Sequence, residues 1–250
     1  MVEADDTIIV IPARLASTRL KRKVLADIHG EAMIVHVWRR AVEAAVGAVV
    51  VACADEAVAD AVRRAGGRAE LTRPELPSGS DRVHAALAAI DPARRYARVV
   101  NLQGDLPTIA PGDIRRALAL LDAPGVDIGT IAAEITDAAE RDDANVVKVI
   151  AGFAPGARAA RALAFTRAAA PWGEGAHYHH IGLYAYRREA LERFVGLAPS
   201  PLERRERLEQ LRALEAGMRI EVALVDTVPL GVDTAADLDA ARRLLSPTGR

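Results

Sequence analysis

The chain has 250 residues, which is enough to bury a sizeable core, and a single α/β domain is the default at this length. Its formal net charge of −1 at pH 7 argues against bulk attraction to nucleic acid or to an anionic membrane, so we expect neither as a partner. Cys53 is the only cysteine, which excludes an internal disulfide, and no apolar stretch approaches the ~20 residues that cross a bilayer. Together with an acidic N-terminus that lacks a secretory core, these features predict a soluble, cytoplasmic protein.

The most informative stretch is the first one, from Thr7 to Val24. Its opening run is apolar and mostly β-branched, as is typical of a buried parallel strand, and Pro12 is predicted to end that strand. The loop that follows carries five basic side chains and two hydroxyls before the next helix near Met33: Arg14, Ser17, Thr18, Arg19, Lys21, Arg22 and Lys23. Ligands of open α/β sheets bind at the carboxyl ends of strands, so this position favours a polyphosphate site over a merely solvated basic loop. The loop matches neither the dinucleotide nor the Walker pattern.

The rest of the first half alternates predicted strands with predicted helices. Strands are expected at 48–52, 69–71 and 98–102, and helices at 33–46, 55–65 and 80–90. Gly66 and Gly67 are expected to form the C-cap of the second helix. This alternation indicates βαβ units and a mostly parallel sheet, with several strand ends opening into polar loops on one side.

The middle of the chain has a different pattern. Strands predicted at 127–135, 145–150, 162–166 and 181–186 have no helix between them long enough for a parallel crossover. We therefore expect antiparallel pairing in a small β-rich lobe over about residues 125–217. One long charged helix is predicted from Pro201 to Gly217, with an apolar stripe formed by Leu208, Leu211, Leu214 and Met218.

A strand at 220–225 and a helix at 235–245, with Asp233 or Thr234 as N-cap, complete the predicted elements. The fold class is therefore α/β. We expect a three-layer α/β/α Rossmann-like domain spanning residues 1–250, with a mostly parallel sheet and the small β-rich lobe or lid appended to it.

Two aspartates are candidates for metal binding. Asp105 follows the strand at 98–102, in the sequence Gln103-Gly104-Asp105, and Asp233 precedes the last helix. Alone, Asp105 is most simply a turn residue and Asp233 a helix cap. Together with the basic loop they form a set suited to Mg²⁺, which typically uses one or two carboxylates and the phosphates of a substrate.

Motifs from about Ile8 to Leu245 carry a resemblance to a known family. They are IPARLASTRL, MIVHV, TR, SGSDR, NLQGDLP, NVVKV, FTRAAAPW, HHIGLYAYR, PSPLE with LEQLR, and GVDT. The chain resembles the nucleotide-sugar cytidylyltransferases, and most closely those of 3-deoxy-manno-octulosonate (Kdo). The resemblance implies transfer of CMP from CTP to the anomeric hydroxyl of Kdo for lipopolysaccharide synthesis, with Mg²⁺ as cofactor and a homodimer as the assembly. The alternatives are CMP activation of another sugar acid, such as 8-amino-Kdo or a sialic-type acid, and a nucleotide-binding protein without turnover.

The resemblance also implies roles for individual residues. CTP would be bound by Arg14, Ser17, Lys23, Thr72, Arg73, Ser78, Gly79 and Arg82. The sugar acid would be bound by Gln103, His180, Tyr184, Glu209 and Gln210. Asp105 and Asp233 would carry Mg²⁺ and, with Arg14 and Lys23, form the catalytic set. Helical periodicity alone directs Glu209 toward solvent, and the His179–His180 pair has no cysteine beside it and predicts no zinc site.

One loop departs from the family pattern. Where the family usually has LPGKP, this chain has Leu20-Lys21-Arg22-Lys23-Val24. The lysine is kept, but the prolines and the glycine are lost. Three successive like charges and the loss of proline predict a loop that is mobile until a triphosphate neutralises it.

Overall fold

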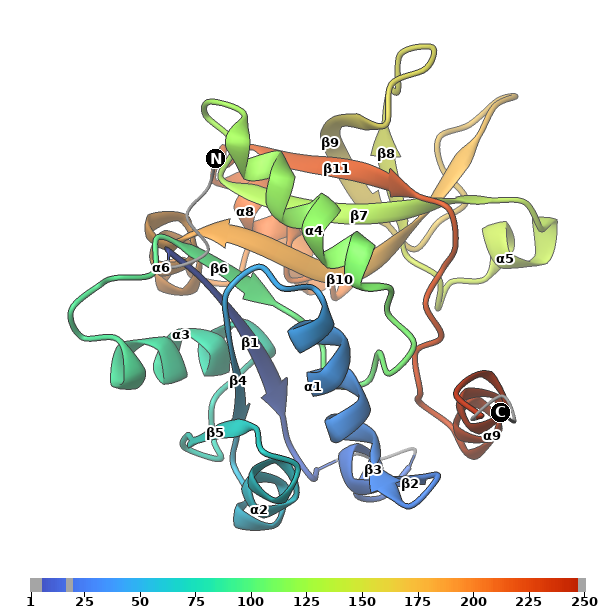
Figure 1. Ribbon diagram of the computed structural model, residues 1–250. Coiled ribbons are helices and arrows are strands. Elements are labelled where there is room, and N and C mark those ends of the chain that lie inside the picture. The colour runs from blue at the N-terminus through green and yellow to red at the C-terminus, as the bar shows by residue number, and fades with distance from the viewer. Residues whose placement is uncertain (1–5, 17–19, 247–250) are drawn as a thin grey trace. The chain divides into compact units, whose positions relative to one another are not determined.

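The computed structural model describes residues 6–16 and 20–246, which fall into two compact units (Figure 1). The first unit contains Met1–Ile114 and Pro229–Arg250, and the second is Arg115–Val228. The fold is mixed α/β, as predicted, with parallel strands in the first unit and mostly antiparallel strands in the second. The three-layer arrangement and the single domain stay predictions. Within the described ranges, no helix is long and apolar enough to cross a membrane.

The first unit contains a parallel sheet in the order β5-β4-β1-β6. Its strands are β1 (Thr7–Ala13), β4 (Ala48–Cys53), β5 (Arg68–Leu71) and β6 (Arg98–Asn101). Every residue of β1 is buried, which explains its apolar, β-branched sequence. The parallel βαβ pattern predicted from the sequence is confirmed.

The prediction that Pro12 ends the first strand is wrong, because β1 continues through Pro12 to Ala13. Pairing with β6 stops at Val10, whereas pairing with β4 extends through Pro12 to Ala13. The carbonyl of Val10 faces β6, where it accepts from Leu102 N at 3.2 Å. Pro12, two residues later, faces the same side, beyond the end of β6. No ladder partner requires an N–H there, so proline is tolerated.

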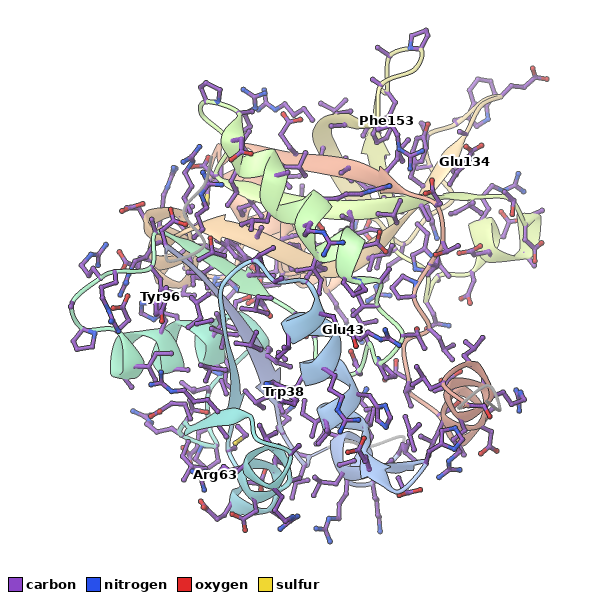
Figure 2. All side chains as sticks on the ribbon, in the orientation of Figure 1. Trp38, Glu43, Arg63, Tyr96, Glu134 and Phe153 are labelled. Atoms are coloured by element: carbon purple, nitrogen blue, oxygen red, sulfur yellow. The ribbon has the colours of Figure 1, made fainter. Side chains whose placement is uncertain are left out.

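Three helices connect these strands: α1 (Met33–Glu43), α2 (Glu56–Arg64) and α3 (Gly79–Ile90). Helix α1 is shorter than predicted because Ala45 has a left-handed conformation, with φ of 52°. The C-cap of α2 is confirmed, since Gly66 N donates to Arg63 O and Gly67 N to Val62 O, each at 2.9 Å. At Gly67 an added Cβ would lie 2.8 Å from the ring of Trp38, which is labelled in Figure 2, so glycine suits this close approach.

The C-terminal helix α9 (Ala235–Leu244) packs on the hairpin formed by β2 (Asp27–Ile28) and β3 (Glu31–Ala32). Their contact contains a cluster of buried apolar side chains: Ile28, Met33, Val232, Leu238 and Ala241. The Arg242 guanidinium also donates to the Asp27 carbonyl at 2.9 and 3.0 Å. This packing holds the segment after the basic loop beside the segment before α9, although about 200 residues separate them in the sequence.

The second unit contains a sheet in the order β10-β7-β11-β9-β8. Its strands are β7 (Ile128–Ile135), β8 (Lys148–Ala151), β9 (Ala159–Thr166), β10 (His177–Arg187) and β11 (Ile220–Val225). Strands β7 and β11 are parallel, whereas β7 and β10, β9 and β11, and β8 and β9 pair antiparallel, which confirms the antiparallel pairing predicted for this region. Strand β8 also pairs with β10, at His179 and Lys148, so the sheet curls back on itself.

Short helices complete the chain. They are α4 (Pro111–Ala119), α5 (Ala138–Asp142), α6 (Arg188–Gly196), α7 (Pro201–Glu206) and α8 (Leu211–Glu215), with single turns η2 (Lys23–Leu25) and η3 (Leu120–Asp122).

The prediction of a single long helix from Pro201 to Gly217 is wrong. Arg207 has a left-handed backbone, with φ of 57°, and ends α7 before α8 begins. A capping box between Ser200 and Glu203 fixes the start of α7, and Arg212 of α8 donates to Glu203 at 2.6 Å. The chain therefore turns back so that these two short helices pair by charge, and helical periodicity does not hold across the break.

Candidate active site

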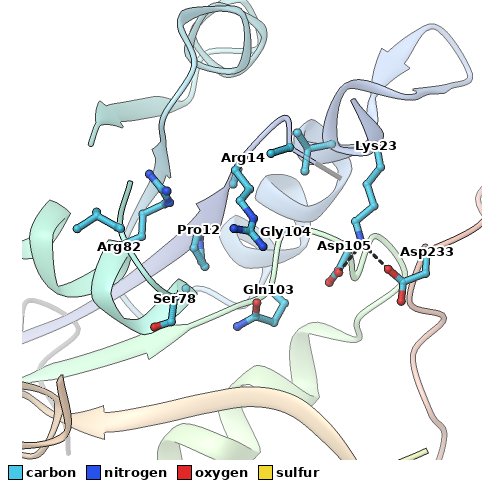
Figure 3. A pocket seen from close by; sticks show the side chains of 14 residues that line it. Pro12, Arg14, Lys23, Ser78, Arg82, Gln103, Gly104, Asp105 and Asp233 are labelled. Carbon is cyan, nitrogen blue, oxygen red and sulfur yellow. Dashed lines mark hydrogen bonds and ion pairs between the residues drawn. The ribbon is translucent and has the colours of Figure 1, made fainter. Parts of the chain in front are cut away.

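A cavity of about 340 Å³ lies in the first unit at the carboxyl ends of β1 and β6 and at the start of α3 (Figure 3). Eight of the predicted site residues line it: Arg14, Lys23, Ser78, Gly79, Arg82, Gln103, Asp105 and Asp233. The strand ends, the basic loop and a helix N-terminus converge on this hollow. Such a helix end favours an anionic ligand, since its free N–H groups and its dipole point toward the ligand.

The centre of the site is a three-residue cluster in which Lys23 bridges Asp105 and Asp233. The Lys23 Nζ donates to Asp105 Oδ2 at 2.9 Å and to Asp233 Oδ1 at 2.7 Å. Its side chain is only 14% exposed, against 35% and 41% for the two carboxylates. Burial alone lowers the pKa of Lys23, but the two carboxylates outweigh burial and raise the pKa above its usual 10.5. Lys23 is therefore a protonated cation held between two acids.

Backbone contacts bring the two aspartates together. Asp105 O accepts from Val232 N at 2.9 Å, and Thr108 Oγ1 accepts from Leu230 N at 2.8 Å. Gly104 permits a close approach under β1, because a Cβ there would lie 2.9 Å from the Pro12 carbonyl oxygen. The N-cap alternative for Asp233 is also resolved. Thr234 caps α9 by accepting from Asp237 N at 3.2 Å, which leaves the Asp233 carboxylate to the cavity.

The turn that carries Lys23 has a strained entry. Arg22 adopts a left-handed conformation, with φ of 54° and ψ of 32°, which L residues other than Asn and Asp rarely adopt. This is the position of the glycine in the family's LPGKP loop. The neighbouring Lys21 and Arg22 line a separate hollow beside α2, with Asp60 and Arg64, while Lys23 alone reaches the aspartates. The predicted mobility of this loop stays a prediction.

Among the described residues, the other cations that line the cavity are Arg14 and Arg82. Arg14 is exposed, whereas Arg82 is buried at 2% and donates to Thr72 Oγ1 and to Arg73 O at 3.1 Å. Burial first, and the charge of Arg14 second, lower the pKa of Arg82. Two like charges at one end of a cavity repel each other, so an anion bound there would stabilise both.

The other residues predicted to bind CTP do not all face the cavity in the way that Arg14 and Lys23 do. Thr72 and Arg73 do not line the cavity; Arg82 ties them to its rim, and Thr72 also donates to Cys53 O at 3.2 Å. Ser78 is the N-cap of α3, accepting from Asp81 N at 3.2 Å and donating to the Asp81 carboxylate at 2.7 Å. Ser17 lies outside the described residues. Gln103 faces the cavity and donates to Asn101 Oδ1 at 3.1 Å.

The four other residues predicted to contact the sugar acid belong to the second unit. His180 is buried, and its ring lies 5.5 Å from that of Tyr184. Burial, and then the neighbouring His179, lower the pKa of His180 to about 3, so His180 is neutral. Thr130 donates to Leu183 O at 2.7 Å, which leaves the Thr130 oxygen to accept from His180 Nε2 at 3.0 Å. The neutral tautomer protonated at Nε2 is therefore assigned to His180.

Tyr184 is likewise uncharged. Burial first, and then the proximity of Tyr186 and Glu209, raise its pKa well above 10.0. Glu209 is half-buried, with 31% of its side chain exposed, and Gln210 is buried. The solvent orientation that periodicity gives for Glu209 fails because the helix is broken at Arg207. The structure thus brings His180, Tyr184 and Glu209 into one polar–aromatic region.

Comparison with known proteins identifies the family. The family model described as "Cytidylyltransferase" matches residues 8–220, most of the chain. The chain belongs to the cytidylyltransferase family. This cytidylyltransferase is 66% identical over 240 residues to the 3-deoxy-manno-octulosonate cytidylyltransferase of Rhodospirillum centenum, covering 96% of this chain and 93% of the relative. It is 65% identical over 243 residues to that of Parvibaculum lavamentivorans, covering 97% and 94%.

A solved structure is similar over the same length. It is that of a CMP:2-keto-3-deoxy-manno-octonic acid synthetase complexed with CTP, with a TM-score of 0.88 and 37% identity, covering 96% of this chain and 98% of that one. The resemblance inferred from the motifs is therefore confirmed at the level of the family and of the fold.

Two residues of this cytidylyltransferase were not predicted from its sequence and support the site. Asp55 Oδ2 accepts from Leu15 N at 3.1 Å and so anchors the start of the basic loop. Thr130 is fully buried and fixes His180. Asp55 follows a strand end, which is a detectable signal. The signal for Thr130 is weaker, a single hydroxyl within the apolar run of β7.

Proposed function

We propose that this cytidylyltransferase transfers CMP from CTP to the anomeric hydroxyl of 3-deoxy-D-manno-octulosonate, giving CMP-Kdo and pyrophosphate for lipopolysaccharide synthesis. The observation that carries the proposal is the cavity in which two carboxylates share a cation beside two arginines and a helix N-terminus. These are the parts that bind a metal–triphosphate complex. The choice of sugar acid is supported by relatives 66% and 65% identical that are named for this reaction.

The residues present fit Mg²⁺. Asp105 and Asp233 point their carboxylates at one cation, the Lys23 ammonium, which shows that their oxygens can converge on a positive charge. Among residues 6–16 and 20–246, no group of three or more His, Cys, Asp or Glu side chains is arranged to hold a metal. Two carboxylates suit Mg²⁺, which keeps several waters and takes substrate phosphates as ligands. When bound, Mg²⁺ would neutralise charge on the triphosphate.

The chain's own residues then act by positioning and by charge. The sugar hydroxyl oxygen bonds to the α-phosphorus, the bond from that phosphorus to the bridging oxygen of the β-phosphate breaks, and the hydroxyl proton is released. Arg14 and Arg82 would face the phosphates. Because the two guanidinium groups repel each other, the negative charge of the phosphoryl group that is transferred would stabilise both. Ser78 and Gly79 line the cavity at the N-terminus of α3, which would face the nucleotide phosphates. No covalent nucleophile is required.

The second unit would bind the sugar acid. Neutral His180 and neutral Tyr184 offer hydrogen bonds without charge, which suits the hydroxyl groups of a sugar. Glu209 and Gln210 add an acidic acceptor and an amide. A site built from such groups discriminates strongly against analogues that lack a matching hydroxyl, because its own polar groups would be left unpaired.

The same proposal includes a homodimer formed through the second unit. Among its described residues, the most exposed large apolar side chains are Trp172 and Leu163, with relative exposures of 99% and 64%. Leu163 lies on β9, and Trp172 lies in the segment between β9 and β10. Exposed side chains of this kind favour a protein interface. The enzyme would work in the cytoplasm, where Cys53, buried and with its pKa raised to about 11 by that burial, stays reduced.

Pyrophosphate release from CTP and Mg²⁺ with a panel of sugar acids tests the function. We expect release with Kdo and much less with 8-amino-Kdo or a sialic-type acid. Preferred release with either of the latter would support another sugar acid. CTP binding without release from any of the acids would support a nucleotide-binding protein without turnover.

A further inference from the structure

The ammonium group of Lys23 bonds one oxygen of each carboxylate that a metal would use. Lys23 Nζ lies 2.9 Å from Asp105 Oδ2 and 2.7 Å from Asp233 Oδ1, and its side chain is 14% exposed. An ammonium group at these distances fills the space between the two acids, so it and a divalent cation exclude each other there. We infer that Lys23 is an internal counter-ion that closes the Asp105–Asp233 pair in the nucleotide-free enzyme and must leave before a divalent cation binds.

This inference rests on the proposed metal role of Asp105 and Asp233. Electrostatics explains why the closed form is stable without ligand. Two carboxylates facing one point repel each other, and Lys23 removes that repulsion by donating to both.

The cavity also explains what would draw Lys23 away. Arg14 and Arg82 repel each other within the cavity, where a triphosphate is attracted to them. A bound triphosphate would give the Lys23 ammonium a new anionic partner and free both carboxylates together. The nucleotide would thus open the metal site, whereas a metal arriving alone would have to compete with the lysine. Divalent cation and CTP should therefore bind with positive coupling, part of which resides in Lys23.

The neighbours of Lys23 do not share this role. Lys21 and Arg22 line a different hollow with Asp60 and Arg64 of α2. Lys21 is exposed, although it is only two residues from Lys23 and carries the same charge. Lys21 is therefore a matched control that changes the net charge of the loop without touching the carboxylate pair.

The first experiment measures Mn²⁺ binding to the full chain without nucleotide, by electron paramagnetic resonance, for wild type, Lys23→Met and Lys21→Met. If the open form is populated at roughly 1–10%, Lys23→Met should bind Mn²⁺ about 10- to 100-fold more tightly than wild type. Lys21→Met should match wild type. Unchanged or weaker Mn²⁺ binding by Lys23→Met would overturn the inference, because the lysine would then not compete with the metal.

A second measurement needs no variant and covers the case in which Lys23→Met does not fold. The chain has three lysines, of which Lys148 is fully buried and donates to three backbone carbonyls. Amine-reactive labelling read by peptide mass spectrometry should modify Lys21 and spare Lys23. Rising Mn²⁺ without nucleotide should increase labelling of Lys23 and leave Lys21 constant. If saturating Mn²⁺ does not change the labelling of Lys23, the displacement of Lys23 by the metal is contradicted.

Failure of the inference and failure of the proposed metal site give different results. Mn²⁺ binding in the presence of CTP is compared between wild type and Asp105→Asn. If Asp105→Asn weakens Mn²⁺ binding but Lys23→Met binds Mn²⁺ as wild type does without nucleotide, the metal site stands and the exchange fails. If Asp105→Asn binds Mn²⁺ as well as wild type does, the proposed metal site itself fails.

Discussion

Replacing Thr130 by valine tests whether a buried hydroxyl positions the sugar-side histidine. Thr130 is fully buried on β7, donates to Leu183 O at 2.7 Å and contacts His180 Nε2 at 3.0 Å. Valine has nearly the same shape, so no cavity is created. The change leaves the carbonyl of Leu183 and the N–H of His180 short of a partner in a buried region.

The magnitude follows from those two groups. A buried polar group that loses its partner costs about 1–3 kcal/mol. For a chain of this size, 1 kcal/mol lowers Tm by roughly 2–4 °C, so the loss of both partners, about 2–6 kcal/mol together, should lower Tm by roughly 4–24 °C. Without the bond to Thr130 the ring of His180 is no longer fixed. It should then shift relative to the rings of Tyr184 and Phe165, whose centroids lie 5.5 and 4.7 Å away.

The assay combines thermal unfolding with steady-state pyrophosphate release. We expect KM for the sugar acid to rise about 10-fold, with KM for CTP unchanged, since Thr130 belongs to the second unit and lies outside the nucleotide cavity. Thr227→Val, at an exposed threonine of the same unit, is the control and should change neither quantity. A Thr130→Val enzyme with wild-type Tm, or with equal changes in both KM values, would refute the positioning role.

Further predictions concern the cluster, the loop, the surface and the histidine. Asp105→Asn should lower turnover at least about 100-fold with little change in the circular dichroism spectrum, because it removes a charge from the proposed metal site and not a core contact; near-normal pyrophosphate release would contradict this assignment. Arg22→Gly should raise stability by about 1 kcal/mol in urea unfolding, because glycine adopts the left-handed conformation at φ of 54° without strain, and Lys21→Gly is the control. Light scattering at micromolar concentration should give a dimer for wild type and a monomer for the pair Leu163→Arg and Trp172→Arg; a monomeric wild type would contradict the interface. The pKa of His180 is depressed from 6.5 to about 3, so the unfolded state takes up its proton first and stability is lost as pH falls from about 6.5 toward 3. His180→Gln should show a shallower loss of stability over that range, and a parallel loss in both proteins would argue against a buried neutral histidine.

The elements that could be predicted from the sequence are those whose signals are local. A fully buried strand such as β1 needs an apolar run, and the C-cap of α2 needs two glycines, and both patterns stand in the chain itself. The extension of β1 through Pro12 could not be found this way. It depends on where β6 stops, which is a property of a neighbouring strand about 90 residues away.

The break between α7 and α8 is a stronger case. Nothing in Arg207 itself predicts a left-handed residue, since arginine is a good helix former. The structure explains the break through contacts that helical periodicity cannot register. Arg212 donates to Glu203 at 2.9 and 2.6 Å, and the N-terminal end of α7 is capped by Ser200 and Glu203. These bonds between helices outweigh the intrinsic preference of a few residues for one continuous helix.

Asp233 illustrates the same limit at the site itself. Local sequence offers two cap residues, Asp233 and Thr234, and the local rules prefer aspartate at least as much as threonine. The structure selects Thr234 because its neighbour is required elsewhere. Asp233 is held beside Lys23 and Asp105 by the packing of α9 on the β2–β3 hairpin and by the bond from Val232 N to Asp105 O at 2.9 Å. Since a threonine follows, the helix loses no cap when the aspartate is directed into the cavity. The pair Asp233-Thr234 therefore separates two tasks that one residue could not perform, and exchanging the two residues should leave α9 capped while emptying the cluster of one of its acids.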